Sequence, residues 1–174
     1  MYIKKQMNKI ITLLFALIIV SCGQTNQKNY NELVNKHIND NEVANFLKKL
    51  GSNYEFDDSY LKSYGAKYYI YGEKGIELNF NESDTLEAIF FKLDKLNPEI
   101  ELPLNIKQTD TRDELEEKMG KADSYFVGLQ KLSAYYLNKD MVIVYKSKDT
   151  LNMSNGIRSI SIQKLDKEKI LEIK

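Results

Sequence analysis

Several residue types are scarce in this chain of 174 residues, which has one cysteine, one histidine, two prolines and no tryptophan. Nucleophilic catalysis needs a base beside the nucleophile. The one histidine, His37, occupies an apolar helical position that is typical of a partly buried or capping residue. The only two arginines, Arg112 and Arg158, are too few for phosphate recognition by paired guanidinium groups. We therefore predict that the protein is not an enzyme and has no catalytic residue.

The motifs that hold common cofactors are also missing. The sequence has no glycine-rich phosphate loop, no dinucleotide-binding motif and no calcium-loop pattern of alternating oxygen ligands. Adjacent acids on a helix point to different faces, so Glu116 and Glu117 indicate a solvated face. Asp57 and Asp58 lie in a predicted loop and are the one acidic pair that could meet a cation. We predict no cofactor and no metal site.

The first 22 residues have the layout of an export signal. Three lysines, Lys4, Lys5 and Lys9, precede an apolar run over residues 10–20. This run is too short to cross a bilayer, which takes about 20 residues. It ends in a branched aliphatic residue, a tolerated residue, a small residue and a cysteine, which are Ile19, Val20, Ser21 and Cys22.

This order resembles the lipobox of bacterial lipoprotein precursors. The resemblance implies a signal peptide over residues 1–21, cleavage before Cys22, and acylation of that cysteine with diacylglycerol and a further chain such as palmitate. Two or more acyl chains make a durable membrane anchor. Gly23, where an aspartate would favour the inner membrane, favours the outer membrane. We therefore expect a lipid-anchored protein of the cell envelope, facing the periplasm or the cell surface.

The remaining chain is mildly acidic. The first 21 residues contain three of the 25 basic residues and none of the 25 acidic ones, so residues 22–174 have a net charge of −3. We expect no nucleic-acid partner, because no basic surface is indicated. With Cys22 acylated no disulfide can form, so stability must come from packing. Residues 22–31 are polar without an apolar period and predict a flexible tether.

Beyond the tether the sequence predicts an α+β fold of two tandem repeats, each a helix followed by three strands (αβββ), with the helices packed on antiparallel sheet. The first repeat spans residues 32–97, a connector with both prolines spans 98–108, and the second repeat spans 109–174. Apolar spacing predicts helix at 33–38 and at 43–50, with Gly51 as its C-cap. A second helix begins at a cap on Thr109 or Thr111 and ends at Gly120. Strands are expected at 68–71, 76–80, 86–93, 132–137, 141–145 and 157–162, and residues 165–174 form a strand or a short helix.

The repeat rests on matches that follow one another in the same order, although generic αβββ patterning is the alternative. The pairs are Phe46–Gly51 with Leu115–Gly120, Tyr68–Tyr69 with Tyr135–Tyr136, residues 76–80 with 141–145, and the triplet 84–86 with 149–151. The arrangement resembles the tandem-repeat fold of the β-lactamase inhibitor proteins and the single-unit fold of small outer-membrane assembly lipoproteins. No functional residue follows from this resemblance of architecture.

Tyrosine is the most distinctive residue of the chain, which has twelve, all but Tyr2 beyond the predicted signal peptide. Tyrosine is enriched at binding hot spots, although core packing is the alternative. The candidate binding residues are Tyr60, Tyr64, Tyr68, Tyr69, Tyr71, Tyr135 and Tyr136. We expect a non-enzymatic module that binds another envelope protein, as an assembly factor or as an inhibitor or immunity protein. A module that binds a glycan or small ligand through its tyrosines is the alternative.

Two short triplets allow a separate hypothesis. Asp84-Thr85-Leu86 and Asp149-Thr150-Leu151 resemble the acceptor triplet for threonine O-glycosylation in some bacterial envelope systems. A turn that enters a strand is the simpler interpretation of both.

Overall fold

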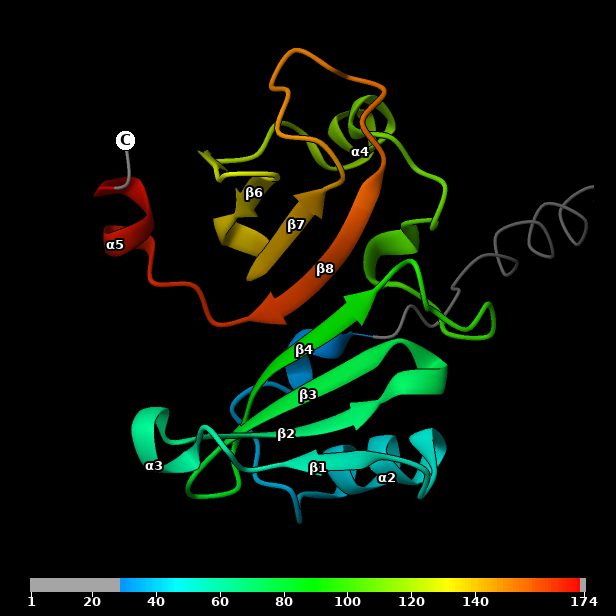
Figure 1. The fold of residues 1–174 in the computed structure, drawn as a ribbon, viewed down its shortest axis with the longest axis vertical. Helices are drawn as coiled ribbons and strands as arrows, with labels where there is room; N and C mark the ends of the chain where they lie inside the picture. The colour runs from blue at the N-terminus through cyan, green and yellow to red at the C-terminus, as the bar shows by residue number, and fades with distance from the viewer. Residues whose placement is uncertain (1–28, 173–174) are drawn as a thin grey trace, which may run out of the picture.

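The computed structural model describes residues 29–172, so the predicted lipobox with Cys22 and most of the predicted tether lie outside the described residues. The described chain is α+β, and its strands form one antiparallel sheet of eight strands in the order β1-β2-β3-β4-β8-β7-β6-β5 (Figure 1). The strands are β1 (Glu55–Asp57), β2 (Ala66–Tyr71), β3 (Ile76–Asn81), β4 (Leu86–Lys92), β5 (Ser124–Val127), β6 (Leu132–Tyr136), β7 (Met141–Tyr145) and β8 (Ile157–Gln163).

Helices are short. The α-helices are α2 (Asn41–Leu50), α3 (Leu61–Tyr64), α4 (Arg112–Met119) and α5 (Lys167–Glu172), and single 3-10 turns occur at η1 (Tyr30–Glu32), η2 (Gly72–Lys74), η3 (Pro103–Asn105) and η4 (Leu137–Lys139). Within residues 29–172, no helix has both the length and the apolar character needed to cross a membrane.

The predicted caps explain where α4 begins and where both main helices end. The Thr111 side chain accepts a hydrogen bond from the backbone N–H of Glu114, and Glu114 reaches back to the Thr111 N–H, which makes a capping box. Gly51 and Gly120 end α2 and α4 with similar backbone angles, at φ values of 85° and 83°. These positive φ values favour glycine, so both glycines are C-caps as the sequence predicts.

The two halves of the sheet meet at β4 and β8, which Figure 1 shows side by side. Phe90 faces Ser161 in this ladder, with Ile89 opposite Ile162 and Phe91 opposite Ile160. The last strand of each half therefore forms the seam.

The ladders of the two halves share one register. Tyr71 faces Ile76 in the first half and Tyr136 faces Met141 in the second, so residues 71 and 76 match 136 and 141 after the same shift of 65. Each half then has a bulge three residues after Ile76 or Met141, directly after Asn79 and directly after Val144. The ladders on either side of β3 therefore have the same register and bulge position as the ladders on either side of β7.

Two strands were not expected. The sequence predicts three strands in each half, but β1 and β5 add a fourth at each outer edge of the sheet. They are only three and four residues long and carry exposed side chains, so local patterning gives little sign of them. All six predicted strands are confirmed as β2 to β4 and β6 to β8, within one or two residues at their ends.

The predicted helix at residues 33–38 is wrong. Asn35 has a positive φ of 68°, which interrupts a helix. The backbone here pairs with the start of β4 instead, because the Asn35 N–H donates to Leu86 O and the Leu86 N–H donates to Lys36 O. Of the two alternatives for the C-terminal segment, the helix is the one that forms, as α5. The proline-rich connector has no α-helix and contains only the turn η3.

One face of the sheet holds the main core. Val43, Phe46 and Leu50 of α2 and Leu115 of α4 pack in the same apolar cluster as the inward-facing residues of β2 to β4 and β6 to β8. Both main helices therefore cover the same face. The helix α5 packs separately, where Leu165 and Ile170 meet Leu137 and Val142 with Tyr135 at their border.

Candidate functional site

The face of the sheet opposite α2 and α4 is the candidate site. A row of directly opposed residues crosses all eight strands on this face: Glu55, Ile70, Glu77, Phe90, Ser161, Val142, Tyr135 and Ser124. The next row, through Tyr71, Ile76, Phe91 and Ile160, lies in the core, as strand alternation requires. The helix α5 covers the Val142 and Tyr135 end of the outer row. We call the remaining part, from Ile70 to Ser161, the open face.

Two hollows lie on the open face, on either side of the pair Phe90 and Ser161. The larger has a volume of about 700 Å³ and is lined by Lys92 and Ser159, which face each other on one side of that pair. The smaller, of about 390 Å³, is lined by Ala88 and Gln163 on the other side. Phe90 therefore stands between two depressions in an otherwise continuous sheet surface.

The larger hollow has an excess of positive charge. Four cationic side chains line it, against the two carboxylates Glu77 and Asp94. Lys92 Nζ lies 3.1 Å from Glu77 Oε2 and also lies over the Phe90 ring, 5.8 Å from its centroid. The other three cations, Lys95, Lys131 and Arg158, have exposed side chains and make no ion pair with any carboxylate of residues 29–172. Elsewhere the described body is acidic, because five lysines and no acidic residue fall outside it and its net charge is −5.

Three of the predicted binding tyrosines gather at the β1 edge. Tyr60 contacts both Tyr64 and Tyr68, with ring centroids 6.2 Å and 5.9 Å apart. Tyr60 and Tyr64 are 49% and 78% exposed, whereas Tyr68 is half-buried on the open face. α3 supplies Tyr64 and its N-cap Tyr60, so this helix borders the open face with aromatic side chains.

The other four predicted tyrosines lie elsewhere. Tyr71 and Tyr136 are both 1% exposed, so their rings cannot form part of a binding surface. Tyr69 lies on the core side of β2, where the rings of Tyr54 and Phe56 contact it at an angle, each with its centroid 5.1 Å away. Tyr135 packs at the border of the α5 cluster. Strand alternation explains the division, because neighbouring residues in a strand point to opposite faces.

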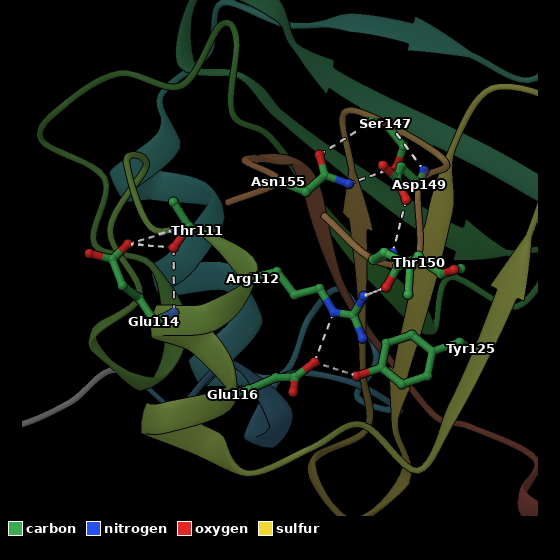
Figure 2. Close-up of polar contacts among 10 residues, drawn as sticks. Thr111, Arg112, Glu114, Glu116, Tyr125, Ser147, Asp149, Thr150 and Asn155 are labelled. Atoms are coloured by element: carbon green, nitrogen blue, oxygen red, sulfur yellow. Dashed lines mark hydrogen bonds and ion pairs between the residues drawn. The ribbon is translucent and has the colours of Figure 1, made fainter. Parts of the chain in front are cut away.

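A second polar cluster lies between α4 and β5. Arg112 Nε donates to Glu116 Oε1 at 2.8 Å, and the Tyr125 hydroxyl donates to the same oxygen at 2.8 Å (Figure 2). The guanidinium carbon of Arg112 lies 4.7 Å from the centroid of the Tyr125 ring. Arg112 Nη1 also donates to the Thr150 carbonyl. These contacts fix the β7–β8 loop against the start of α4.

Electrostatics in this cluster follow from its burial. Burial acts to raise the pKa of Glu116, but the hydrogen bonds from Tyr125 and Arg112 outweigh it, so the pKa lies below its ordinary value. The pKa of Tyr125 is raised, first by burial and then because its hydroxyl donates to the Glu116 carboxylate. Arg112 and Glu116 side chains are only 11% and 10% exposed. The cluster is thus a buried, satisfied network rather than a group of side chains open to a substrate.

The residues that sequence reasoning tested for chemistry have structural partners. His37 Nδ1 accepts from the Asn39 N–H, and its own backbone N–H donates to Asp40. Asp57 Oδ1 accepts from the Ser59 N–H, and hydrogen bonding from the side chain of Ser59, then from its backbone, lowers the pKa of Asp57. Among residues 29–172 no three histidine, cysteine or acidic side chains come together as a metal site would require.

The two glycosylation triplets differ in setting. Leu86 belongs to β4 and is fully buried, whereas Leu151 is 87% exposed in the loop before β8. Thr150 is exposed and Thr85 is half-buried. In the β7–β8 ladder the residue that occupies the place of Leu86 is Ile157, which faces Tyr145 as Leu86 faces Phe80.

Sequence reasoning missed Phe90 and the cations of the larger hollow. Phe90 lies in a predicted strand between two residues that point to the core, so alternation alone could have placed it outward. Lys92 and Lys95 are close in the chain, but Lys131 and Arg158 are far from them, and only the order of the strands brings all four together.

Comparison with known proteins returns no relative: no protein-family model, curated protein or solved structure matches the chain.

Proposed function

We propose that this chain is an envelope lipoprotein, anchored through Cys22, that binds another protein through the open face of its sheet. The observation that carries the proposal is the row from Ile70 to Ser161. It presents the half-buried apolar side chains of Ile70 and Phe90, with Glu77 between them, and no helix of residues 29–172 covers them. Such patches mark interaction sites when they are flanked by polar residues.

The described chain begins on the side of the sheet that the helices cover, not on the open face. Tyr30 packs on the core side of the sheet, with its ring 5.8 Å from Phe46 of α2 and 5.0 Å from Phe91 of β4. The chain that leads to Cys22 therefore joins the domain on the side of the helices. Six residues separate Cys22 from Asn29 and span at most about 21 Å. The open face lies on the opposite side of the sheet from Tyr30, which supports a partner that approaches from that side.

The aromatic residues also favour a protein partner over a glycan. Tyr60 and Tyr64 are exposed at α3, which borders the open face, and Tyr71, the one tyrosine that lines the larger hollow, is buried. A sugar-binding site would present aromatic faces inside the hollow. The assembly-factor and inhibitor roles both remain compatible with an open sheet face.

We further propose that the two halves are tandem copies of one unit, with a helix and four strands in each rather than three. The common register of the ladders and the matched C-caps Gly51 and Gly120 support it. Two of the sequence matches shift: Tyr71, not Tyr69, occupies the place of Tyr136, and Ile157, not Leu151, occupies the place of Leu86.

Two experiments test the function. Cys22→Ser should abolish both processing to the mature size and partition into detergent, and unchanged behaviour of this variant would refute the anchor. For the partner, affinity capture of the chain from envelope extract should yield a stoichiometric protein. Phe90→Glu should lose that protein, whereas Lys48→Glu, an exposed change on α2, should retain it. Retention by Phe90→Glu at unchanged thermal stability would exclude the open face.

A further inference from the structure

The larger hollow of the open face has the chemistry of a specific partner. Its floor crosses five neighbouring strands, from Ile70 on β2 through Glu77, Lys92 and Ser159 to Val144 on β7. The loop between β5 and β6 then adds a wall at the far end. In this loop Leu129 is 93% exposed. The hollow is therefore elongated across the sheet, with apolar side chains at both ends.

The charges around this floor are unbalanced. Lys92 is paired with Glu77, whereas Lys95, Lys131 and Arg158 make no ion pair within the part of the chain that the structure describes. These three cations outnumber Asp94, the other carboxylate of the lining, so the hollow keeps a net positive charge. These three side chains come from the β4–η3 connection, the β5–β6 loop and β8. Cations from three separate segments that converge on one hollow, on a body with a net charge of −5, produce a local positive potential.

We propose that the larger hollow binds an extended, acidic segment of the partner protein. This inference rests on the proposed function and names the chemistry of the partner at that same face. Carboxylates of the segment pair with Lys95, Lys131 and Arg158, and an apolar side chain between them packs against Leu129 and Val144. Complementary charge at a rim sets the choice of partner and the rate of association more than it sets affinity.

An acidic protein segment fits better than an anionic membrane surface. A flat lipid surface cannot enter a hollow whose floor lies on the sheet, whereas an extended chain can follow it across the strands. The described chain also begins on the opposite side of the sheet, where Tyr30 packs between Phe46 and Phe91.

Site-specific photo-crosslinking in intact cells tests the proposal on the full chain. A benzophenone amino acid replaces Lys131 in the hollow, Phe90 in the centre of the open face, or Lys48 on α2 as a control. We expect a protein adduct at Lys131 and at Phe90 but not at Lys48. Mass spectrometry of the adduct at Lys131 should identify an acidic segment. This segment, made as a fluorescent peptide, is then titrated by anisotropy.

Charge reversal supplies the matched comparison. The triple variant Lys95→Glu, Lys131→Glu and Arg158→Glu should bind this peptide about 30-fold more weakly, since each exposed pair changes affinity by roughly threefold or more when attraction becomes repulsion. A control triple, Lys48→Glu, Lys62→Glu and Lys167→Glu, makes the same change of net charge on exposed lysines outside the hollow and should bind within about twofold of the original chain.

The outcomes separate the two claims. An adduct at Phe90 but none at Lys131, a crosslinked segment without excess carboxylates, or equal loss in both triple variants would overturn the acidic segment and leave the open face as the binding surface. A lipid adduct at Lys131 would also overturn it. Absence of any protein adduct at Phe90 and Lys131 would overturn the proposed function itself.

Discussion

Arg112 and Glu116 form a buried ion pair one helical turn apart, with Arg112 Nε 2.8 Å from Glu116 Oε1. The positions of α2 that lie equally far before its C-cap glycine are apolar. The shift that superposes the C-caps Gly51 and Gly120 is 69 residues, and it places Arg112 on Val43 and Glu116 on Leu47. The same shift places Tyr125 on Phe56. One half of the sheet therefore has a polar network where the other has hydrocarbon.

This difference predicts the effect of replacing the polar network with apolar residues. Arg112→Val alone should reduce the free energy of unfolding by about 3 kcal/mol or more, because it leaves the Glu116 carboxylate buried without its cation. The triple variant Arg112→Val, Glu116→Leu and Tyr125→Phe should lie within about 1 kcal/mol of the original chain, since apolar replacement of a whole buried pair is close to neutral. Urea denaturation measures both. A triple variant as unstable as the single one would show that the network contributes more than the pair.

The lowered pKa of Glu116 predicts a pH dependence of stability. A carboxyl whose folded pKa lies below its unfolded value, near 4.3, stabilises the fold above that unfolded value. The contribution is lost as pH falls through the folded pKa. The difference in the free energy of unfolding between the original chain and Glu116→Gln should therefore be largest at pH 7 and shrink below about pH 4. A constant difference from pH 7 to pH 3 would contradict this assignment.

Gly75 is the most constrained glycine of the described chain. It has a φ of +65°, and a Cβ added to it would lie 2.7 Å from the backbone of Leu96. Gly75→Ala should lower the free energy of unfolding by about 3 kcal/mol, from backbone strain together with the steric clash. Gly65→Ala is the matched control, because Gly65 has the same φ with nothing within 4 Å of an added Cβ. It should cost only about 1 kcal/mol by thermal or urea denaturation, and equal losses would show that the clash is relieved.

The buried hydroxyls of Tyr136 and Tyr145 predict a substitution that stabilises the fold. They lie beside each other, and burial raises the pKa of Tyr136 to about 12, yet neither hydroxyl has a hydrogen-bond partner among residues 29–172. Tyr145→Phe should therefore raise the free energy of unfolding by up to about 1 kcal/mol. Tyr30→Phe is the comparison, because the Tyr30 hydroxyl donates to Glu101 O at 2.6 Å, and its loss should cost about 1 kcal/mol. A destabilised Tyr145→Phe would reveal a partner for its hydroxyl.

Local signals were enough to predict most of the fold. The capping residue Thr111, the C-cap glycines and the alternation of six strands act over a few residues and are visible in sequence. The segment at 33–38 was mistaken for helix because its backbone is paired with Leu86, a contact that local patterning cannot report. β1 and β5 were missed for a similar reason, since each is held by its neighbour in the sheet.

The site depends on contacts between distant segments and was harder to predict. The abundance of tyrosine made Tyr71 and Tyr136 candidate binding residues, but strand alternation places both in the core. The hollow with Lys131 and Arg158 exists only because β8 pairs with β4 and the β5–β6 loop reaches the same end of the sheet. Neither the pairing of β8 with β4 nor the position of the β5–β6 loop leaves a local pattern in the sequence.

The seam between β4 and β8 has a consequence for how the sheet can grow. These two strands pair with each other, with Phe90 opposite Ser161, so neither leaves a free edge. A strand from another chain can join the sheet only at its borders, which are the short strands β1 and β5. Strands this short offer few backbone groups for pairing, which disfavours edge-to-edge aggregation.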